Sequence, residues 1–75
     1  MNVRWTETDS RNFSANAKRR RQELGLSQDE VAQKAGISRA SYNYLETKPE
    51  RNILIGTALS IAQALDTTVE ALVAS

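Results

Sequence analysis

The sequence predicts an all-α domain, a compact bundle of five short helices. Apolar residues recur three or four positions apart along most of the chain, which is the period of a helix with one buried face. Ser27 is followed three residues later by the acidic Glu30, as in a capping box that opens a helix. Gly36 lies where a helix would end in a left-handed residue. These start and stop signals divide the chain into short helices.

Composition limits the possible functions. The chain has 75 residues, and after a short arm we expect residues 9–75 to form a single domain. It contains neither cysteine nor histidine, which argues against a disulfide framework, a zinc site and His-dependent catalysis. We therefore expect no enzyme activity and no cofactor. No apolar run approaches the roughly 20 residues of a membrane span, and residues 1–10 are too polar for a signal peptide, so we expect a cytoplasmic protein.

The distribution of charge is more informative than the net charge of +1. All ten Lys and Arg residues lie between Arg4 and Arg51, whereas residues 52–75 contain two charged residues, Asp66 and Glu70. A basic N-terminal part and a nearly uncharged C-terminal part predict two surfaces with different partners.

The N-terminus shows no helical period, and we expect residues 1–8 to form a flexible arm. Arg4 beside Trp5 would allow the arm to follow a nucleic-acid groove. In the alternative, Trp5 folds back on the helices. The first helix is expected to begin at Asp9 or Ser10 and to end at about Leu24.

Two predicted helices follow one another almost without a linker. The first covers about residues 28–34 and is closed by Gly36. Ser38 can then cap a second helix of about residues 39–46. Two capped helices joined by a glycine and a very short connection predict a helix-turn-helix.

This stretch resembles the repressor/Cro-like helix-turn-helix family of phage and bacterial regulators, also called the XRE family, over roughly residues 13–72. The matching residues are Arg21, Gly25-Leu26-Ser27-Gln28, Glu30-Val31-Ala32, Ala35-Gly36-Ile37-Ser38, Leu45-Glu46, Ile61-Ala62, Ala64-Leu65 and the run from Thr68 to Leu72. The resemblance implies a lambda-repressor-like fold that binds double-stranded DNA. It also implies an ion pair between Arg21 and Glu46 that would brace two helices. The sequence departs from the family at Arg20, where an apolar residue is usual, and at Ile53, where proline is common.

The helix of about residues 39–46 is the candidate recognition helix, because in such motifs the second helix enters the DNA major groove. The residues predicted to contact bases are Arg39, Ala40, Asn43 and Tyr44. Arg39 can bond guanine O6 and N7, Ala40 can touch a thymine methyl, and Asn43 can address adenine or a phosphate. Tyr44 corresponds to an outward position that often reads bases in the family.

A second set of residues is predicted to contact DNA phosphates: Gln28, Ser38, Ser41, Lys48, Arg51, Asn52 and Arg19. Gln28 begins a helix whose free N–H groups and dipole favour an anion. Lys48, Arg51 and Asn52 follow the recognition helix and would hold the backbone beside it. For Arg19, a solvated helix face is the alternative.

The C-terminal third is predicted to form two closing helices, one of about residues 57–65 and one that a Thr67–Glu70 capping box opens. Residues 53–75 contain more aliphatic side chains than one small core can bury. The predicted surplus, which would form a homodimer interface, is Leu54, Leu59, Leu72 and Val73. Such a dimer would set two recognition helices about one turn of DNA apart. An apolar C-terminus without a partner is the alternative.

These features predict a sequence-specific transcriptional regulator that binds a pseudo-palindromic operator as a homodimer, in a bacterial or phage-infected cell, on the nucleoid. Repression by blocking RNA polymerase is the expected mode, and direct contact with RNA polymerase would need an acidic surface near Asp29. No small-molecule ligand is expected. A phage repressor, a restriction–modification controller protein and an antitoxin all remain open. The rival is a protein-interaction module of the same fold without DNA binding, which the low net charge favours.

Overall fold

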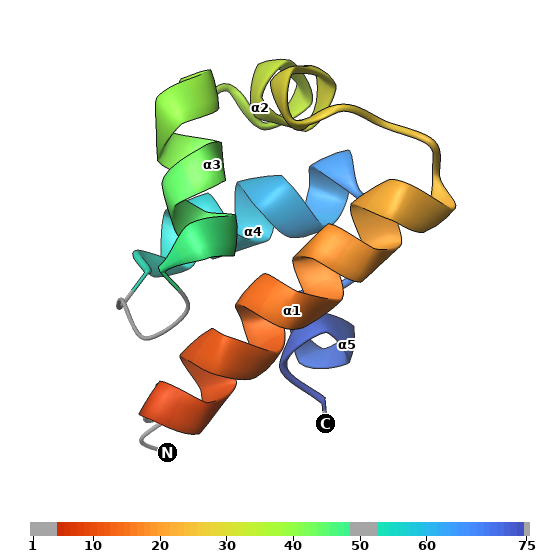
Figure 1. Cartoon of the computed structure of the whole chain (residues 1–75). Helices are drawn as coiled ribbons and strands as arrows, with labels where there is room; N and C mark the ends of the chain where they lie inside the picture. The colour runs from red at the N-terminus through yellow and green to blue at the C-terminus, as the bar shows by residue number, and fades with distance from the viewer. Residues whose placement is uncertain (1–4, 49–52, 75) are drawn as a thin grey trace.

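Figure 1 shows the computed structural model of the chain, in which residues 5–48 and 53–74 are described. Over these ranges five helices follow one another, and the predicted all-α fold is confirmed. The helices are α1 (Glu7–Glu23), α2 (Gln28–Ala35), α3 (Arg39–Thr47), α4 (Ile55–Ala64) and α5 (Val69–Val73).

The first helix begins earlier than the sequence suggested. Thr6 is its N-cap, and the side chains of Thr6 and Asp9 each accept a hydrogen bond from the other's backbone N–H, both at 3.0 Å. This capping box starts α1 at Glu7 instead of at Asp9 or Ser10, because a threonine cap with an acidic third residue satisfies two free N–H groups.

The residues before α1 pack on the domain. The rings of Trp5 and Phe13 lie with their centroids 5.8 Å apart, and the Trp5 indole N–H donates to the Ser10 hydroxyl. Residues 5–8 are therefore part of the folded unit, and of the two alternatives for Trp5 the folded-back one applies. The rest of the predicted arm, residues 1–4, lies outside the described part of the chain.

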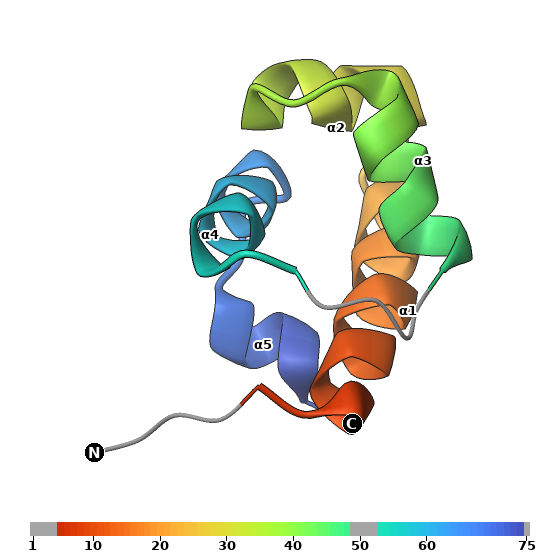
Figure 2. The same cartoon turned by 90° about the vertical axis from the view of Figure 1, so that its left-hand side faces the viewer.

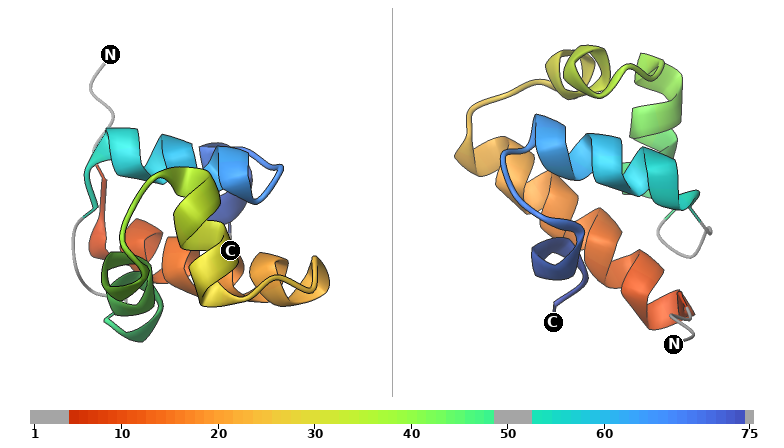
Figure 3. Two further views of the ribbon diagram at one scale, coloured as in Figure 1. Left: turned by 90° about the horizontal axis from the view of Figure 1, so that it is seen from above. Right: turned by 180° about the vertical axis from the view of Figure 1, so that it is seen from behind.

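The five helices enclose one core. α2 packs against α3 and α4, and α1 packs against α3 and α5. In Figure 2, α2 crosses one end of the molecule while α1 and α4 form two of its sides, and the rear view in Figure 3 shows α5 beside α1. The buried apolar residues are Phe13, Ala17, Val31, Ala32, Tyr42, Leu45, Ala58, Ile61, Ala62, Leu65 and Leu72.

Left-handed residues end three of the helices. Gly25 and Gly36 follow α1 and α2 with φ angles of 71° and 73°, a conformation that glycine adopts without a Cβ penalty. The predicted role of Gly36 is thus confirmed. The turn after α4 uses Asp66 instead, at φ 56°. Backbone N–H groups of Asp66 and Thr67 bond to carbonyls in the last turn of α4, so the turn has the same hydrogen-bond pattern as a glycine turn.

Two sequence predictions for the C-terminal helices are wrong in detail. α4 begins at Ile55, two residues before the expected start. The N-cap of α5 is Thr68, whose hydroxyl accepts a backbone N–H of the first turn, so the expected Thr67–Glu70 capping box does not form. The reason is that the Thr67 N–H is used to close the turn after α4, which leaves the next residue to cap α5.

Leu72 must be removed from the predicted dimer interface, because its side chain is only 3% exposed and belongs to the core. Two asparagines of α1 hold α5 in the orientation that buries it. Asn12 Nδ2 donates to the Val73 carbonyl at 3.0 Å, and Asn16 Nδ2 donates to the carbonyls of Leu72 and Ala74 at 2.8 and 2.7 Å. Val73 is half-buried against the same core, so it offers a partner little surface.

Arg20, which departs from the family pattern, has a structural role. Its guanidinium donates to the carbonyls of Leu65 at 3.0 Å and of Asp66 at 3.4 Å. The Leu65 carbonyl belongs to the C-cap residue of α4 and the Asp66 carbonyl to the turn that follows, so Arg20 holds the C-terminal end of α4 from α1.

Candidate nucleic-acid interface

The outer face of α3 is the candidate interface. Ser38 caps the helix by accepting the Ser41 N–H at 3.0 Å, as the sequence predicts. Tyr42 and Leu45 are buried beneath it. The residues on its other side are exposed to solvent: Arg39, Ala40, Ser41, Asn43 and Tyr44. The helix therefore presents a continuous face of small and polar side chains.

The N-terminal end of α2 lies beside this face. The predicted capping box is present: Ser27 Oγ accepts the Glu30 N–H at 3.0 Å, and Glu30 Oε1 accepts the Ser27 N–H at 2.9 Å. The hydrogen bond from the Ser27 backbone holds the pKa of the Glu30 carboxyl below its usual value of 4.5. A fixed first turn keeps the N–H groups of α2 directed outward, where an anion can approach.

A buried serine fixes the far end of α3. Ser14 of α1 is 6% exposed, and its hydroxyl donates to the Leu45 carbonyl at 2.8 Å. That carbonyl lies in the last turn of α3, where the helix itself has no backbone N–H to donate to it. The bond therefore joins α1 directly to the C-terminal end of α3.

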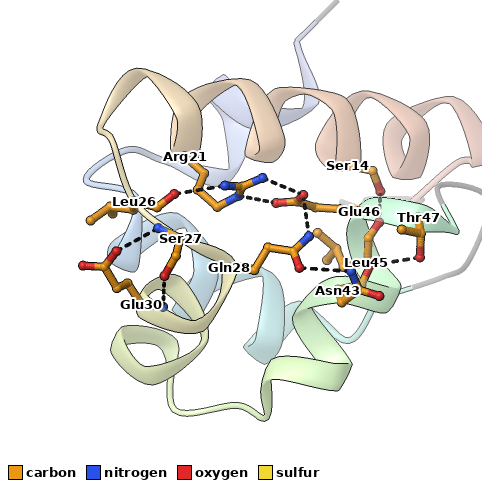
Figure 4. Close-up of polar contacts among 10 residues, drawn as sticks. All are labelled: Ser14, Arg21, Leu26, Ser27, Gln28, Glu30, Asn43, Leu45, Glu46 and Thr47. Carbon is orange, nitrogen blue, oxygen red and sulfur yellow. Dashed lines mark hydrogen bonds and ion pairs between the residues drawn. The ribbon is translucent and has the colours of Figure 1, made fainter.

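An ion pair reinforces the same contact. Arg21 Nε donates to Glu46 Oε2 at 2.8 Å and its Nη2 donates to Oε1 at 3.1 Å, and the two side chains are 14% and 3% exposed (Figure 4). Arg21 Nη1 also donates to the Leu26 carbonyl at 3.0 Å, so the guanidinium joins α1, the α1–α2 turn and α3. Burial alone would raise the pKa of Glu46, but hydrogen bonds from Arg21 and Gln28 hold it below 4.5. The pair raises the pKa of Arg21 in turn.

Gln28 extends this network to the exposed face. Its Nε2 donates to Glu46 Oε1 at 3.0 Å, and its Oε1 accepts a hydrogen bond from Asn43 Nδ2, also at 3.0 Å (Figure 4). A chain of hydrogen bonds thus runs from buried Arg21 to exposed Asn43. Burial raises the pKa of the neighbouring Tyr42 hydroxyl, which keeps this group neutral beside the network.

A family model described as helix-turn-helix matches residues 18–72, most of the chain. The chain belongs to this XRE-type helix-turn-helix family. It is accordingly a DNA-binding helix-turn-helix protein. A comparison with curated proteins gave no match, and a comparison with solved structures gave none.

α3 carries the four residues predicted to contact bases, and all four are exposed. Arg39 and Ala40 lie in the first turn of α3, and Asn43 follows one turn later. Tyr44 is 42% exposed and borders a groove that Trp5 and the start of α4 also line. Tyr44 therefore stands at the edge of the exposed face.

The residues predicted to contact phosphate are only partly brought together. Four of them lie along α3 or beside it: Gln28, Ser38, Ser41 and Lys48. Arg19 does not, because it donates to Asn16, which faces α5, so the guanidinium lies on another side of α1. We therefore remove Arg19 from the candidate interface. Arg51 and Asn52 fall outside the described residues.

Sequence reasoning missed Ser14 and the Gln28–Asn43 link. Ser14 stands among the apolar positions of α1, which is a weak signal of a buried hydroxyl with a backbone partner. Gln28 and Asn43 are distant in sequence and carry no pairing signal. In residues 5–48 and 53–74, no helix is long and apolar enough to cross a membrane, and no cluster of acidic side chains is arranged to hold a metal ion.

Proposed function

We propose that this protein is a sequence-specific transcriptional regulator that binds a pseudo-palindromic operator as a homodimer, with α3 in the major groove. The observation that carries the proposal is the exposed face of α3, which is anchored from below by Ser14 and by the Arg21–Glu46 pair. A helix held by two contacts from α1 can present its outer side chains to base edges in a fixed register, which sequence reading requires.

Direct readout centres on the first turns of α3. Arg39 is exposed there, and its guanidinium suits the two acceptors of guanine. Ala40, one residue on, suits a thymine methyl group. Ser38, Ser41 and Lys48 would contact phosphates on either side of the groove. Since phosphate contacts dominate affinity, we expect binding to weaken steeply with salt.

The surface proposed for homodimer formation lies at the start of α4. Leu54, Ile55 and Leu59 are 79%, 63% and 50% exposed, and the last two are one helical turn apart. Large apolar side chains gathered at one exposed site are typical of a protein interface. This surface keeps Leu54 and Leu59 of the original prediction and adds Ile55. Replacement of Leu59 by Asp should convert the dimer to monomers in analytical ultracentrifugation, whereas Leu24→Asp at the end of α1 should not.

The proposed effect of binding is repression, because an occupied operator excludes RNA polymerase. Direct contact with RNA polymerase is the route to activation, and the exposed Asp29 in the first turn of α2 offers an acidic group for it. The proposal includes no cofactor, small-molecule ligand or enzymatic step.

Selection of binding sites from a random duplex pool, at low and at moderate salt, tests the proposal. We expect an inverted repeat with half-sites about one helical turn apart. Arg39→Ala should weaken binding to the selected site roughly 5- to 150-fold, the range for loss of a bidentate base contact. Arg19→Ala is the matched control, since this exposed arginine lies away from α3. Weak binding without sequence preference would refute the proposal and favour a protein-interaction module or an antitoxin-type partner of the same fold.

A further inference from the structure

Hydrogen bonds link Arg21, Glu46, Gln28 and Asn43 in a network beneath α3. At each contact one group donates and the other accepts, so the charged end of the network determines the orientation of the amides that follow. We propose that the buried Arg21–Glu46 pair fixes, through Gln28, the orientation of the Asn43 amide, and that Asn43 thereby reads adenine. The inference rests on the proposed function and names a specificity-determining unit within it.

The direction begins at the buried end. A guanidinium has only donors, and an ionised carboxylate has only acceptors. Glu46 accepts two hydrogen bonds from Arg21 and stays ionised, because these bonds hold its pKa below 4.5. The group that faces Glu46 Oε1 from α2 must therefore be a donor, which is the Gln28 Nε2 at 3.0 Å.

The direction then passes to the surface. With Nε2 committed to Glu46, the Gln28 amide turns its oxygen toward α3. Asn43 must meet this oxygen with a donor, and its Nδ2 does so at 3.0 Å. If the Gln28 amide were reversed, its oxygen would face the carboxylate and its NH₂ would face the NH₂ of Asn43. Both contacts would then be repulsive, so the observed orientation is the one that the network allows.

The result is a defined pattern at the exposed end of the network. One Nδ2 hydrogen of Asn43 is bonded to Gln28, so the amide presents its oxygen together with its second Nδ2 hydrogen to a base. Adenine matches this pair, since its N6 amino group donates and its N7 accepts. Guanine offers two acceptors, N7 and O6, and its O6 would oppose the Asn43 oxygen. Asn43 should therefore favour adenine over guanine at its position in each half-site.

Base preferences of four variants, measured by selection from the random duplex pool, test the inference. Asn43→Ala identifies the base pair that Asn43 contacts, because preference should be lost at that position only. Gln28→Ala should relax the same position, from a discrimination of roughly 5- to 150-fold for adenine over guanine to less than about 3-fold. The other positions should keep their preferences. Gln33→Ala, which removes an exposed glutamine of α2 that bonds to Asp29, is the matched control and should change none of them.

The double variant Gln28→Ala/Asn43→Ala separates positioning from phosphate contact. If Gln28 acts through Asn43, its removal has no further effect on base preference once Asn43 is absent. A phosphate contact by Gln28 would instead lower affinity equally for all sequences, with the salt dependence little changed because the amide is neutral. Thermal unfolding followed by circular dichroism checks that each variant is folded.

Three results would overturn the inference. A selected site with no position sensitive to Asn43→Ala would remove Asn43 from readout, and guanine at that position would contradict the amide orientation. A Gln28→Ala variant that keeps full discrimination would show that Gln28 does not set it. In each case the wild-type protein still selects a site and the proposed regulator stands. If the wild-type protein selects no sequence, the proposed function and this inference both fail.

Discussion

Substitution of Glu46 by Gln tests how strongly the buried network stabilises the fold. The change keeps the size of the side chain but removes the charge that accepts two hydrogen bonds from Arg21 and one from Gln28. Arg21 would remain as a largely buried cation facing an amide, and one of the donors around position 46 would meet an NH₂ group. We expect the variant to fold with markedly lower stability.

The magnitude follows from the burial of the pair. Removal of one partner of a fully buried ion pair costs about 3–5 kcal/mol, mainly because the other charge is stranded. Here the Arg21 side chain is 14% exposed and keeps its bond to the Leu26 carbonyl, which reduces the penalty. We therefore expect Glu46→Gln to lower the free energy of unfolding by about 2–4 kcal/mol. A domain of this size has about 4–11 kcal/mol in total, so the loss is a large fraction.

The pH dependence gives a second measure of the same interaction. The pKa of Glu46 is lower in the folded protein than its ordinary 4.5, so the stabilisation is fully present above that value. It is lost as the pH falls through the folded-state pKa. The raised pKa of Arg21 acts only in strongly alkaline solution and does not affect this range. The difference in stability between wild type and Glu46→Gln should therefore be constant near neutral pH and shrink below 4.5.

Urea unfolding followed by far-ultraviolet circular dichroism, at neutral pH and at several acidic values, measures both effects. Glu23→Gln is the matched control, because Glu23 is exposed and its nitrogen–oxygen distance to Arg20 is 3.9 Å. Loss of the Glu23 carboxylate should change the free energy of unfolding by less than about 0.5 kcal/mol. A Glu46→Gln variant within about 0.5 kcal/mol of wild type would refute the reasoning, as would a difference that persists unchanged into acid.

Three further substitutions test other contacts. Ser14→Ala leaves the buried Leu45 carbonyl without its donor and should lower the free energy of unfolding by about 1–3 kcal/mol in urea unfolding, whereas Ser60→Ala, on the surface of α4, should have little effect. Asn16→Ala removes the Nδ2 group that donates to two carbonyls at the end of α5, so amide hydrogen exchange should become faster in α5 before it does in α1; equal rates in wild type and variant would contradict this role of Asn16. Asp66→Gly should raise the free energy of unfolding by up to about 1 kcal/mol, since glycine adopts φ 56° without strain, and a fall in the urea midpoint would show that the aspartate side chain stabilises the turn.

Local signals made the central part of the fold predictable. Ser27, Glu30, Gly36 and Ser38 act on backbone groups within four residues of themselves, and such contacts do not depend on the rest of the molecule. The structure places each of them in its expected role.

The C-terminal helices were harder to predict, because two adjacent residues could each serve as an N-cap and the sequence does not show which side of a short helix faces the core. Thr67 and Thr68 are both acceptable caps for α5, and the choice depends on how the turn after α4 closes. The burial of Leu72 and the exposure of Ile55 depend on which sides of two short helices meet the core. Apolar spacing within such short helices does not determine that choice.

The candidate site combined family resemblance with features that only the fold reveals. The Arg21–Glu46 pair follows from the resemblance, and the structure contains it. The link between Gln28 and Asn43 depends on the angle at which α2 crosses α3, which no sequence pattern states. For the same reason the sequence alone groups Arg19 with the interface, although the packing of α5 on α1 leaves it on another side.

The residues of the network differ in how much they contribute to stability and to DNA recognition. Glu46 is nearly inaccessible and joins three helices, so a change there should alter both folding and the presentation of Asn43. Asn43 is exposed and contributes one hydrogen bond to the network, so its replacement should alter recognition with little loss of stability. Gln28 lies between them, half-buried, and transmits orientation without carrying charge. Base preference at this position can therefore change through residue 43 while the buried pair continues to hold α3 in place.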